Sequence, residues 1–367
     1  MSLAARAIER RSFLRAAGGA FLLGLMPGAR AAAEEAEILF ASAFRRADGG
    51  HGVAVLAENG TVLSAIPLPD RGHDIVFDRV SGRAVAFARQ PGTFALVFDP
   101  AGRAPSQTIA SEPGRHFFGH GVFSPDGRLL YATENDFEAA RGLIGVYDVG
   151  AGFRRIGEFP TGGIGPHECL LLDDGKTLAV ANGGIETHPD FGREELNLAT
   201  MRPSLAFIDR ESGTILESHV LPRTLHQLSI RHMDLDSSGT LWFGCQHRGP
   251  LSERPPLVGR ARRGEGLSLV SLADEALLPM QNYVGSVAVN REAGLVAVSS
   301  PEGNAWLTLR ADTGVLVEHR AMNEVCGLAA DRSGFLVTTG LGDVVADGKP
   351  HAVPDHAWDN HVLRLTV

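Results

Sequence analysis

Short apolar runs recur along this chain, and most of them end at Gly, Asp or Asn. The clearest series is 120–127, 129–133, 143–148 and 155–159, in which Pro125-Asp126-Gly127 closes the first run. Runs of this length, bounded by turn residues, predict β-strands joined by tight turns. The best helical candidate, 190–201, lies in an insertion between two expected strands. The pattern therefore predicts an all-β protein.

The group of four strands repeats along the chain. First strands are expected to begin near His73, His120, His167, His232, Ser286 and Cys326. Four-stranded units of about 40–45 residues, lengthened here by loop insertions, are typical of β-propeller blades. Counting first strands gives six blades, whereas counting second and third strands gives seven, and we favour seven.

The two ends of the chain each carry an incomplete blade. Runs 38–42, 52–56 and 62–66 are expected to be strands two to four of a blade that lacks its first strand. Run 361–366 is expected to be a third strand that lacks its fourth. Pairing between the N- and C-terminal strands would close the ring and hide the exposed sheet edges. Residues 34–367 are thus interpreted as one propeller domain.

The first 33 residues have the pattern of a twin-arginine signal peptide. Arg10-Arg11 precedes Phe13-Leu14, a weakly apolar stretch follows at 16–26, and small residues at 29–33 suit signal peptidase. Export through the Tat translocase to the periplasm is the expectation. The apolar stretch is shorter than the ~20 residues that span a bilayer, so no stable membrane span is expected.

Charge and cysteine content narrow the function further. The formal net charge of −9 becomes more negative once the arginine-rich leader is removed, which argues against a nucleic-acid partner. The three cysteines show no CxxC or CxxCH spacing, so haem c attachment is not expected, and no nucleotide cofactor is expected either. We expect the three thiols to be buried. A disulfide between two of them is the alternative.

Four of the expected first strands begin with histidine, and the first strand of a propeller blade lines the central channel. His73, His120, His167 and His232 are therefore candidate metal ligands, because imidazole binds copper, iron, zinc and nickel. Their register differs: two of them lie three residues before the aligned apolar position and two lie four before it. Since strand residues alternate in direction, not all four are required to face the channel. The alternative is that each histidine bonds the backbone of a neighbouring blade.

Further polar residues occur directly after the expected second strands and in the C-terminal tail. We expect these segments to form loops at the channel mouth. Turn preferences explain the Gly and Asn there, but not the Glu and His. The candidate ligand-binding residues are Glu134, Asn135, Glu168, Asn182, Glu186, His188, Arg231, His247, Trp358, Asp359, Asn360 and His361.

Several stretches resemble the DUF1513 family. They are GHGVFSPDGRLLYATEND (119–136), GPHECLLLDDGKTLAVANGGIETHPDFGR (165–193), LNLATMRPSL (196–205), SIRHMDLD (229–236) and WDNH (358–361). The resemblance runs from about residue 36 to the C-terminus. It implies a periplasmic β-propeller associated with imelysin-type iron-regulated proteins and thereby with metal acquisition, and it implies no catalytic residues.

Four functions are compatible with these features. The first is an accessory protein that binds a metal ion, with iron or copper favoured, or a small ligand at the channel mouth, together with periplasmic iron-uptake proteins. The second is a lactonase-type metal-dependent hydrolase using Glu134, Asn135, Glu168, Asn182 and Asp359. A multi-histidine copper reductase and a plain interaction scaffold are the others. A non-enzymatic role is favoured over catalysis.

Overall fold

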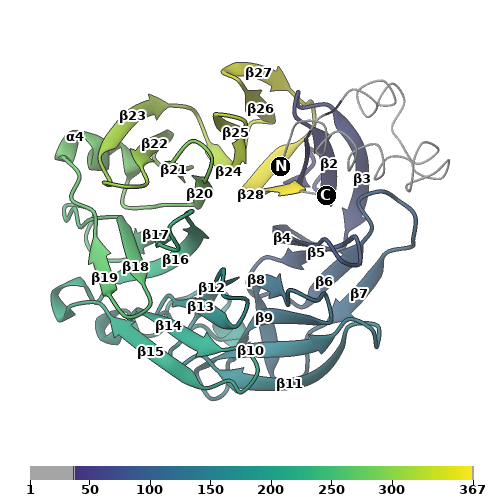
Figure 1. Cartoon of the computed structure of the whole chain (residues 1–367), viewed down its shortest axis with the longest axis horizontal. Coiled ribbons are helices and arrows are strands. Elements are labelled where there is room, and N and C mark those ends of the chain that lie inside the picture. The colour runs from purple at the N-terminus through teal and green to yellow at the C-terminus, as the bar shows by residue number, and fades with distance from the viewer. Residues whose placement is uncertain (1–35, 37, 366–367) are drawn as a thin grey trace.

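The computed structural model describes Ala36 and residues 38–365 of the chain. This part forms seven four-stranded antiparallel sheets arranged as blades around a central channel (Figure 1). The all-β prediction and the count of seven blades are confirmed. The predicted signal peptide, residues 1–33, lies outside the described residues.

Each blade is named here by its place in the chain. Blade 1 contains β1 (Leu39–Arg45), β2 (His51–Ala57), β3 (Val62–Leu68) and, innermost, β28 (Ala357–Leu365). Blade 2 contains β4 (Gly72–Asp78), β5 (Arg83–Ala88), β6 (Phe94–Phe98) and β7 (Gln107–Ala110). Blade 3 contains β8 (Arg115–Phe123), β9 (Leu129–Asp136), β10 (Arg141–Asp148) and β11 (Arg154–Pro160). Blade 4 contains β12 (Pro166–Leu171), β13 (Thr177–Asn182), β14 (Ser204–Asp209) and β15 (Ile215–Val220).

The remaining blades follow the same order from the channel outward. Blade 5 contains β16 (Leu228–Leu235), β17 (Leu241–His247), β18 (Val258–Arg262) and β19 (Gly266–Leu269). Blade 6 contains β20 (Ser286–Asn290), β21 (Leu295–Ser300), β22 (Ala305–Arg310) and β23 (Leu316–Ala321). Blade 7 contains β24 (Val325–Asp331), β25 (Gly334–Thr339), β26 (Asp343–Ala346) and β27 (Lys349–Ala352).

Burial along the strands explains the apolar runs in the sequence. Every residue of β13 is buried, because neighbouring blades cover both faces of a middle strand. The outer strand β11 instead alternates exposed and half-buried positions, as expected for a strand at the rim. Continuous apolar runs therefore mark the middle strands, and alternating runs mark the outer ones.

The turn between β8 and β9 shows why Gly and Asp separate the runs. Gly127 N–H donates to the Ser124 carbonyl at 2.9 Å, and Gly127 has a φ of +67°. A Cβ at this position would lie 2.7 Å from the carboxylate of Asp78 in the neighbouring blade. Only glycine fits this combination of backbone conformation and close approach.

The ring closes through β28, which pairs antiparallel with β1 from Leu39↔Leu365 to Arg45↔Ala357. The predicted closure by N- and C-terminal strands is confirmed, as is the position of the first three strands (Figure 1). The prediction that residues 361–366 form a third strand is wrong. Blade 7 already has four strands of its own, so the C-terminal run supplies the innermost strand of blade 1.

The closure also buries apolar side chains between blades 1 and 7. Phe40 is fully buried and packs in one cluster with Leu336 of blade 7 and Val362 of β28. Phe44 meets Trp358 edge to face, with ring centroids 5.9 Å apart. The first and last segments of the propeller are therefore joined by packing as well as by backbone hydrogen bonds.

The helical prediction for 190–201 is wrong. The insertion contains only two short 3-10 helices, η1 (Pro189–Phe191) and η2 (Leu198–Thr200). Gly192 ends η1 at a φ of +62°, and the Asn197 side chain bonds the backbone of Gly184 and Glu186. These bonds hold the insertion as a compact loop over the end of β13.

The three cysteines are buried and unpaired. Burial raises the pKa of the Cys326 thiol to about 12, so these thiols behave as small apolar groups. Within the described part of the chain, no helix has the length and apolar character needed to cross a membrane.

We predict that Phe40→Ala lowers the free energy of unfolding by about 3 to 5 kcal/mol, because it leaves a cavity between the two ends of the ring. Phe191→Ala is the matched control: this ring is 56% exposed, and its removal is expected to change stability by less than about 0.5 kcal/mol. Urea unfolding followed by tryptophan fluorescence measures both. Equal losses for the two variants would contradict the role of the closing cluster.

Candidate metal centre

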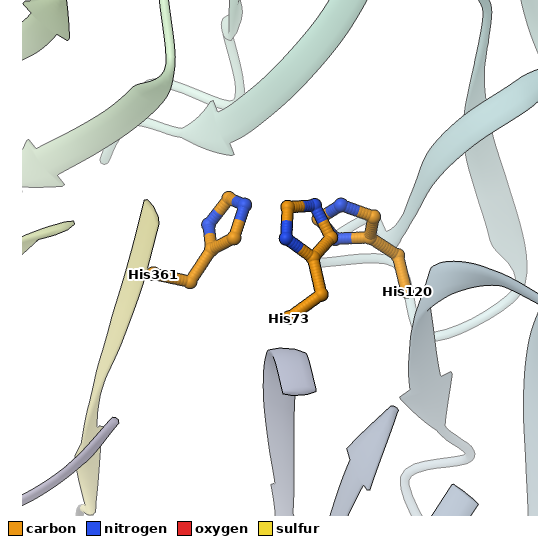
Figure 2. A group of neighbouring side chains, drawn as sticks. All are labelled: His73, His120 and His361. Atoms are coloured by element: carbon orange, nitrogen blue, oxygen red, sulfur yellow. The ribbon is translucent and has the colours of Figure 1, made fainter. Parts of the chain in front are cut away.

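Five histidines converge in the channel, each from the inner strand of a different blade. His361 comes from β28, His73 from β4, His120 from β8, His167 from β12 and His232 from β16. Each ring centroid lies between 4.6 and 6.2 Å from those of at least three of the other rings. Figure 2 shows the rings of His73, His120 and His361 gathered in the channel. Residues far apart in sequence thus form one compact layer of imidazoles, the histidine layer.

Irregularities in the inner strands direct the rings into the channel. In four of these strands the pairing with the neighbouring strand shifts register where the histidine lies, for example between Gly72 and Ile75 and between Phe117 and Gly121. On β28 the shift falls between Trp358 and Val362. A bulge rotates the residues that follow it, so side chains with different offsets can point the same way. The structure therefore brings all four metal candidates together despite their unequal spacing.

The ring nitrogens form two overlapping groups of three, which share His120. One contains His73, His120 and His361, the other His120, His167 and His232, and the nitrogens of each group lie within 4.8 Å of one another. The two Nε2 atoms of His167 and His232 are 3.3 Å apart. Two imidazole nitrogens at this distance need a shared proton or a shared cation between them.

Carboxylates contact the other side of several rings. Asp359 Oδ1 lies 3.0 Å from His73 Nδ1, and Asp74 Oδ2 lies 3.2 Å from His120 Nδ1. Glu168 Oε2 lies 3.4 Å from His232 Nδ1, an atom that has no hydrogen-bond partner among the described residues. At His73 and His120, a carboxylate on Nδ1 fixes the proton there and leaves Nε2 as the ligand atom, as is common around protein metal sites. Nε2 of His120 is buried and has no hydrogen-bond partner among the described residues.

Burial keeps four of the five histidines neutral. It lowers the pKa of His73 to about 4, and it lowers the pKa values of His167, His232 and His361 well below their ordinary value. Neighbouring charges add to the effect, Arg231 on His167 and His361 on His232. Neutral imidazole carries the lone pair that a metal ion requires.

The carboxyl groups respond to burial in two ways. Burial raises the pKa of Glu168 well above its ordinary value and that of Asp234 to about 6. Burial alone would do the same at Asp359, but the His73 hydrogen bond and the charges of His73 and Arg71 lower the pKa of this group below its ordinary value. Arg71 Nε donates to Asp359 Oδ2 at 2.5 Å. Asp359 is therefore ionised, and so is Asp74, because its interactions with the histidines, first the hydrogen bond with His120, outweigh burial and lower its pKa.

The histidine layer separates two mouths of the channel. At the entry mouth, where inner strands begin, a pocket is lined by His116, His167, His188, Arg193, Ser229 and Arg231, among others. At the exit mouth, a cavity of about 530 Å³ is lined by all seven inner strands. Its wall is largely apolar but includes the carboxyl groups of Asp74, Glu168 and Asp234.

Not all sequence candidates reach the channel. Glu134 bonds Tyr147 and Arg155 on the strands outside it, and Asn182 bonds Thr161 and Ser204. Both side chains thus hold strands of blades 3 and 4 together. The residues that a lactonase-type hydrolase would use as oxygen ligands are therefore not all in one place. Some lie in the channel and others lie inside the blades.

Other candidates lie around the entry mouth. Asn135 Nδ2 lies 3.0 Å from His116 Nε2 and donates to the Thr187 carbonyl, beside the entry pocket. His188 lines that pocket and accepts from the Asp190 N–H. The Glu186 N–H donates to Asn197 in the loop above it.

The remaining candidates have structural partners as well. His247 Nε2 lies 2.9 Å from Glu253. Asn360 donates to the Tyr283 hydroxyl at 2.8 Å, and Trp358 packs on Phe44 and His356. Of the twelve ligand-binding candidates, only Glu168, Asp359 and His361 belong to the histidine layer or its carboxyl partners.

Sequence reasoning missed the carboxyl groups of Asp74, at the layer, and Asp234, in the exit cavity. Asp74 directly follows His73, as Glu168 directly follows His167, and this His-acid pair is a signal that was visible. Asp234 lies two residues after His232, on the same strand face. Arg89 and Tyr283 were also missed, because nothing in their local sequence connects them to the channel.

Comparisons with known proteins concern the family and the fold. A segment of 92 residues is 36% identical to "Lipoprotein LprN" of Mycobacterium tuberculosis, and it covers 24% of this chain and 23% of that protein. The chain thus matches only about a quarter of the length of this relative. Hydrazine synthase of Kuenenia stuttgartiensis superposes with a TM-score of 0.59 over 85% of this chain and 92% of that chain, at 16% identity, a likeness of fold alone.

The family match covers the histidine layer. A family model described as "Protein of unknown function (DUF1513)" matches residues 66–365, which include all five histidines and their carboxyl partners. Since this match extends over most of the chain, the protein belongs to the DUF1513 family.

Proposed function

We propose that this protein is an exported metal-binding propeller, an accessory protein of metal acquisition, that holds a transition-metal ion at the histidine layer. One observation carries the proposal: five imidazoles meet as two overlapping three-nitrogen groups, and burial lowers the pKa values of His73, His167, His232 and His361. Buried polar atoms normally have hydrogen-bond partners, and their lack at His120 Nε2 supports a ligand there.

The donor set favours a particular class of metal. Imidazole ligands suit copper, iron, zinc and nickel, whereas calcium and magnesium prefer oxygen ligands. The nearby carboxylates contact the Nδ1 atoms of His73 and His120. We therefore retain copper and iron as the favoured metals, with His120 as the central ligand.

Two features support the proposal that the protein is exported. The N-terminal Arg10-Arg11 motif with its apolar stretch is typical of twin-arginine substrates, which fold before they cross the membrane. The partial relative is named a lipoprotein. Both support a periplasmic location, in which the protein would work with metal-uptake proteins.

We predict stoichiometric metal in protein that is exported natively and purified without a chelating column. Elemental analysis measures the content per chain. His120→Ala removes the ligand shared by both groups and is expected to lower metal affinity by about 100-fold or more, beyond the 10- to 100-fold of outer-shell changes. His319→Ala, an exposed histidine on β23, is the control that retains the metal. Metal-free wild-type protein, unable to take up copper or iron on addition, would refute the proposal.

Asp359→Asn tests the carboxylate on His73. The amide keeps the shape but loses the charge that fixes the His73 proton, so metal affinity is expected to fall by about 10- to 100-fold. Competition against a chelator of known affinity measures the change. Asp355→Asn, on the exposed part of the same tail, is the matched control. Identical affinities for both variants would show that Asp359 does not orient a ligand.

The metal-free protein is expected to lose stability as the pH falls from about 6.5 to about 4. The pKa of His73 is about 4 in the folded chain and 6.5 in the unfolded chain, so the unfolded state binds the proton first as the pH falls. This stability is present above pH 6.5 and is lost on acidification. Urea unfolding across this range measures the slope, and bound metal is expected to delay the loss. Constant stability down to pH 4 would contradict neutral buried histidines.

A further inference from the structure

The entry mouth carries more positive than negative charge. Burial lowers the pKa of Arg89, and the charges of Arg71 and Arg193 lower it further. Burial likewise lowers the pKa of Arg231, with the charges of Arg248 and Arg89 contributing. These guanidinium groups are thus close enough to repel one another across blades 2, 4 and 5.

The nearby acids are already paired. Asp359 is held between Arg71 and His73, and Glu195 accepts from Arg248 at 2.8 Å. Among the described residues, no ion pair is found for Arg89, Arg193 or Arg231. Arg89 and Arg231 are partly buried and Arg193 is exposed. Clustered cations without matching acids attract an anion.

A pocket lies among these groups. It is lined by Arg193, Arg231, Ser229 and His167, among others, and has a volume of about 50 Å³. Glu195 also lines it, with its carboxylate paired to Arg248. Two polar atoms of its lining residues, Arg231 Nε and Ser229 Oγ, are buried without a hydrogen-bond partner in the described chain. Arg231 Nη1 meanwhile donates to Gln246, which fixes the guanidinium plane. Two donors are therefore held in place with nothing in the fold to accept from them.

We propose that this pocket binds the oxygen atoms of a small oxyanion, a carboxylate or an inorganic anion of similar size. The volume holds only one or two groups the size of a water molecule, so a larger ligand would place its head group here and its remainder outside. Guanidinium donors match oxyanions in geometry and charge. This proposal is argued from the arginines and Ser229 and does not depend on the proposed metal ion.

The position of the pocket links it to the proposed metal. His167 lines the pocket and also belongs to the histidine layer. An anion bound at Arg231 therefore lies beside the metal ligands, on the entry side. This second step rests on the proposed function: the anion would approach the bound metal ion as an additional ligand or as the counter-ion of its chelate.

Calorimetric titration of the metal-free mature chain tests the pocket. Sodium acetate, nitrate and phosphate serve as probes, and they distinguish a carboxylate from planar and tetrahedral inorganic anions. At least one is expected to bind in a 1:1 ratio. Arg231→Gln is expected to weaken that binding by about 10-fold or more, since hydrogen bonds to charged groups are lost. Arg154→Gln, an exposed arginine on the rim strand β11, is the control that leaves it unchanged.

Ser229→Ala keeps the test decisive if Arg231→Gln fails to fold. This change removes one hydroxyl and is expected to weaken the same anion by several-fold. Binding that none of the pocket variants alters, or the absence of binding by all three anions, would overturn the proposal.

The metal-loaded chain separates the two proposals. In a copper-loaded chain, the bound anion is expected to shift the copper absorption spectrum, and Arg231→Gln is expected to keep the metal but lose this shift. If the chain takes up no metal yet binds the anion through Arg231, the pocket stands and the metal centre fails. If metal binds but no anion does, the metal centre stands and the pocket fails.

Discussion

The pairing of β28 with β1 is the interaction on which both the ring and the histidine layer depend. Ser42 Oγ donates to the His361 carbonyl at 2.7 Å, and Phe44 packs against Trp358 across the same pair of strands. The strand that closes the ring also carries His361 into the channel and Asp359 to His73. Without β28 the chain would have an open sheet edge and a layer lacking both its fifth imidazole and the carboxylate that orients another. Closure of the fold and assembly of the site are therefore one event.

The histidine layer adds little to folding stability, which points to a role in binding. A buried polar atom without a partner costs about 1 to 3 kcal/mol, and such atoms occur at His120, His361 and Arg231 around one short segment of the channel. Apolar side chains could fill the same volume, as they do in the middle strands, where β13 is buried throughout. The chain instead places neutral imidazoles there and holds them with carboxyl groups. The cost of burying these unpaired polar atoms is offset only when a ligand binds the lone pairs of the imidazole nitrogens.

Much of this organisation was predictable, and the errors have identifiable physical causes. Strand length and turn residues marked the blades, and the position of His73, His120, His167 and His232 at strand entries indicated a common site. The direction of each ring was not predictable, because a bulge such as that between Phe117 and Gly121 leaves no clear sequence signal. The strand at 361–366 was misplaced because a single apolar run does not reveal its partner. Glu134 and Asn182 lie on the middle strands β9 and β13 rather than in loops at the mouth, and their side chains bond residues of the blades.

The two mouths of the channel give the histidine layer access from both sides, and this access bears on what the layer can serve. The entry pocket is lined by Arg193, Arg231 and Glu195, among others. The exit cavity of about 530 Å³ is lined by acids and arginines together, among them Asp74, Asp234 and Arg364. A purely structural metal ion needs only its ligands and a closed shell around them. Here the shell is open on two sides, an arrangement suited to reversible loading rather than to permanent reinforcement of the ring.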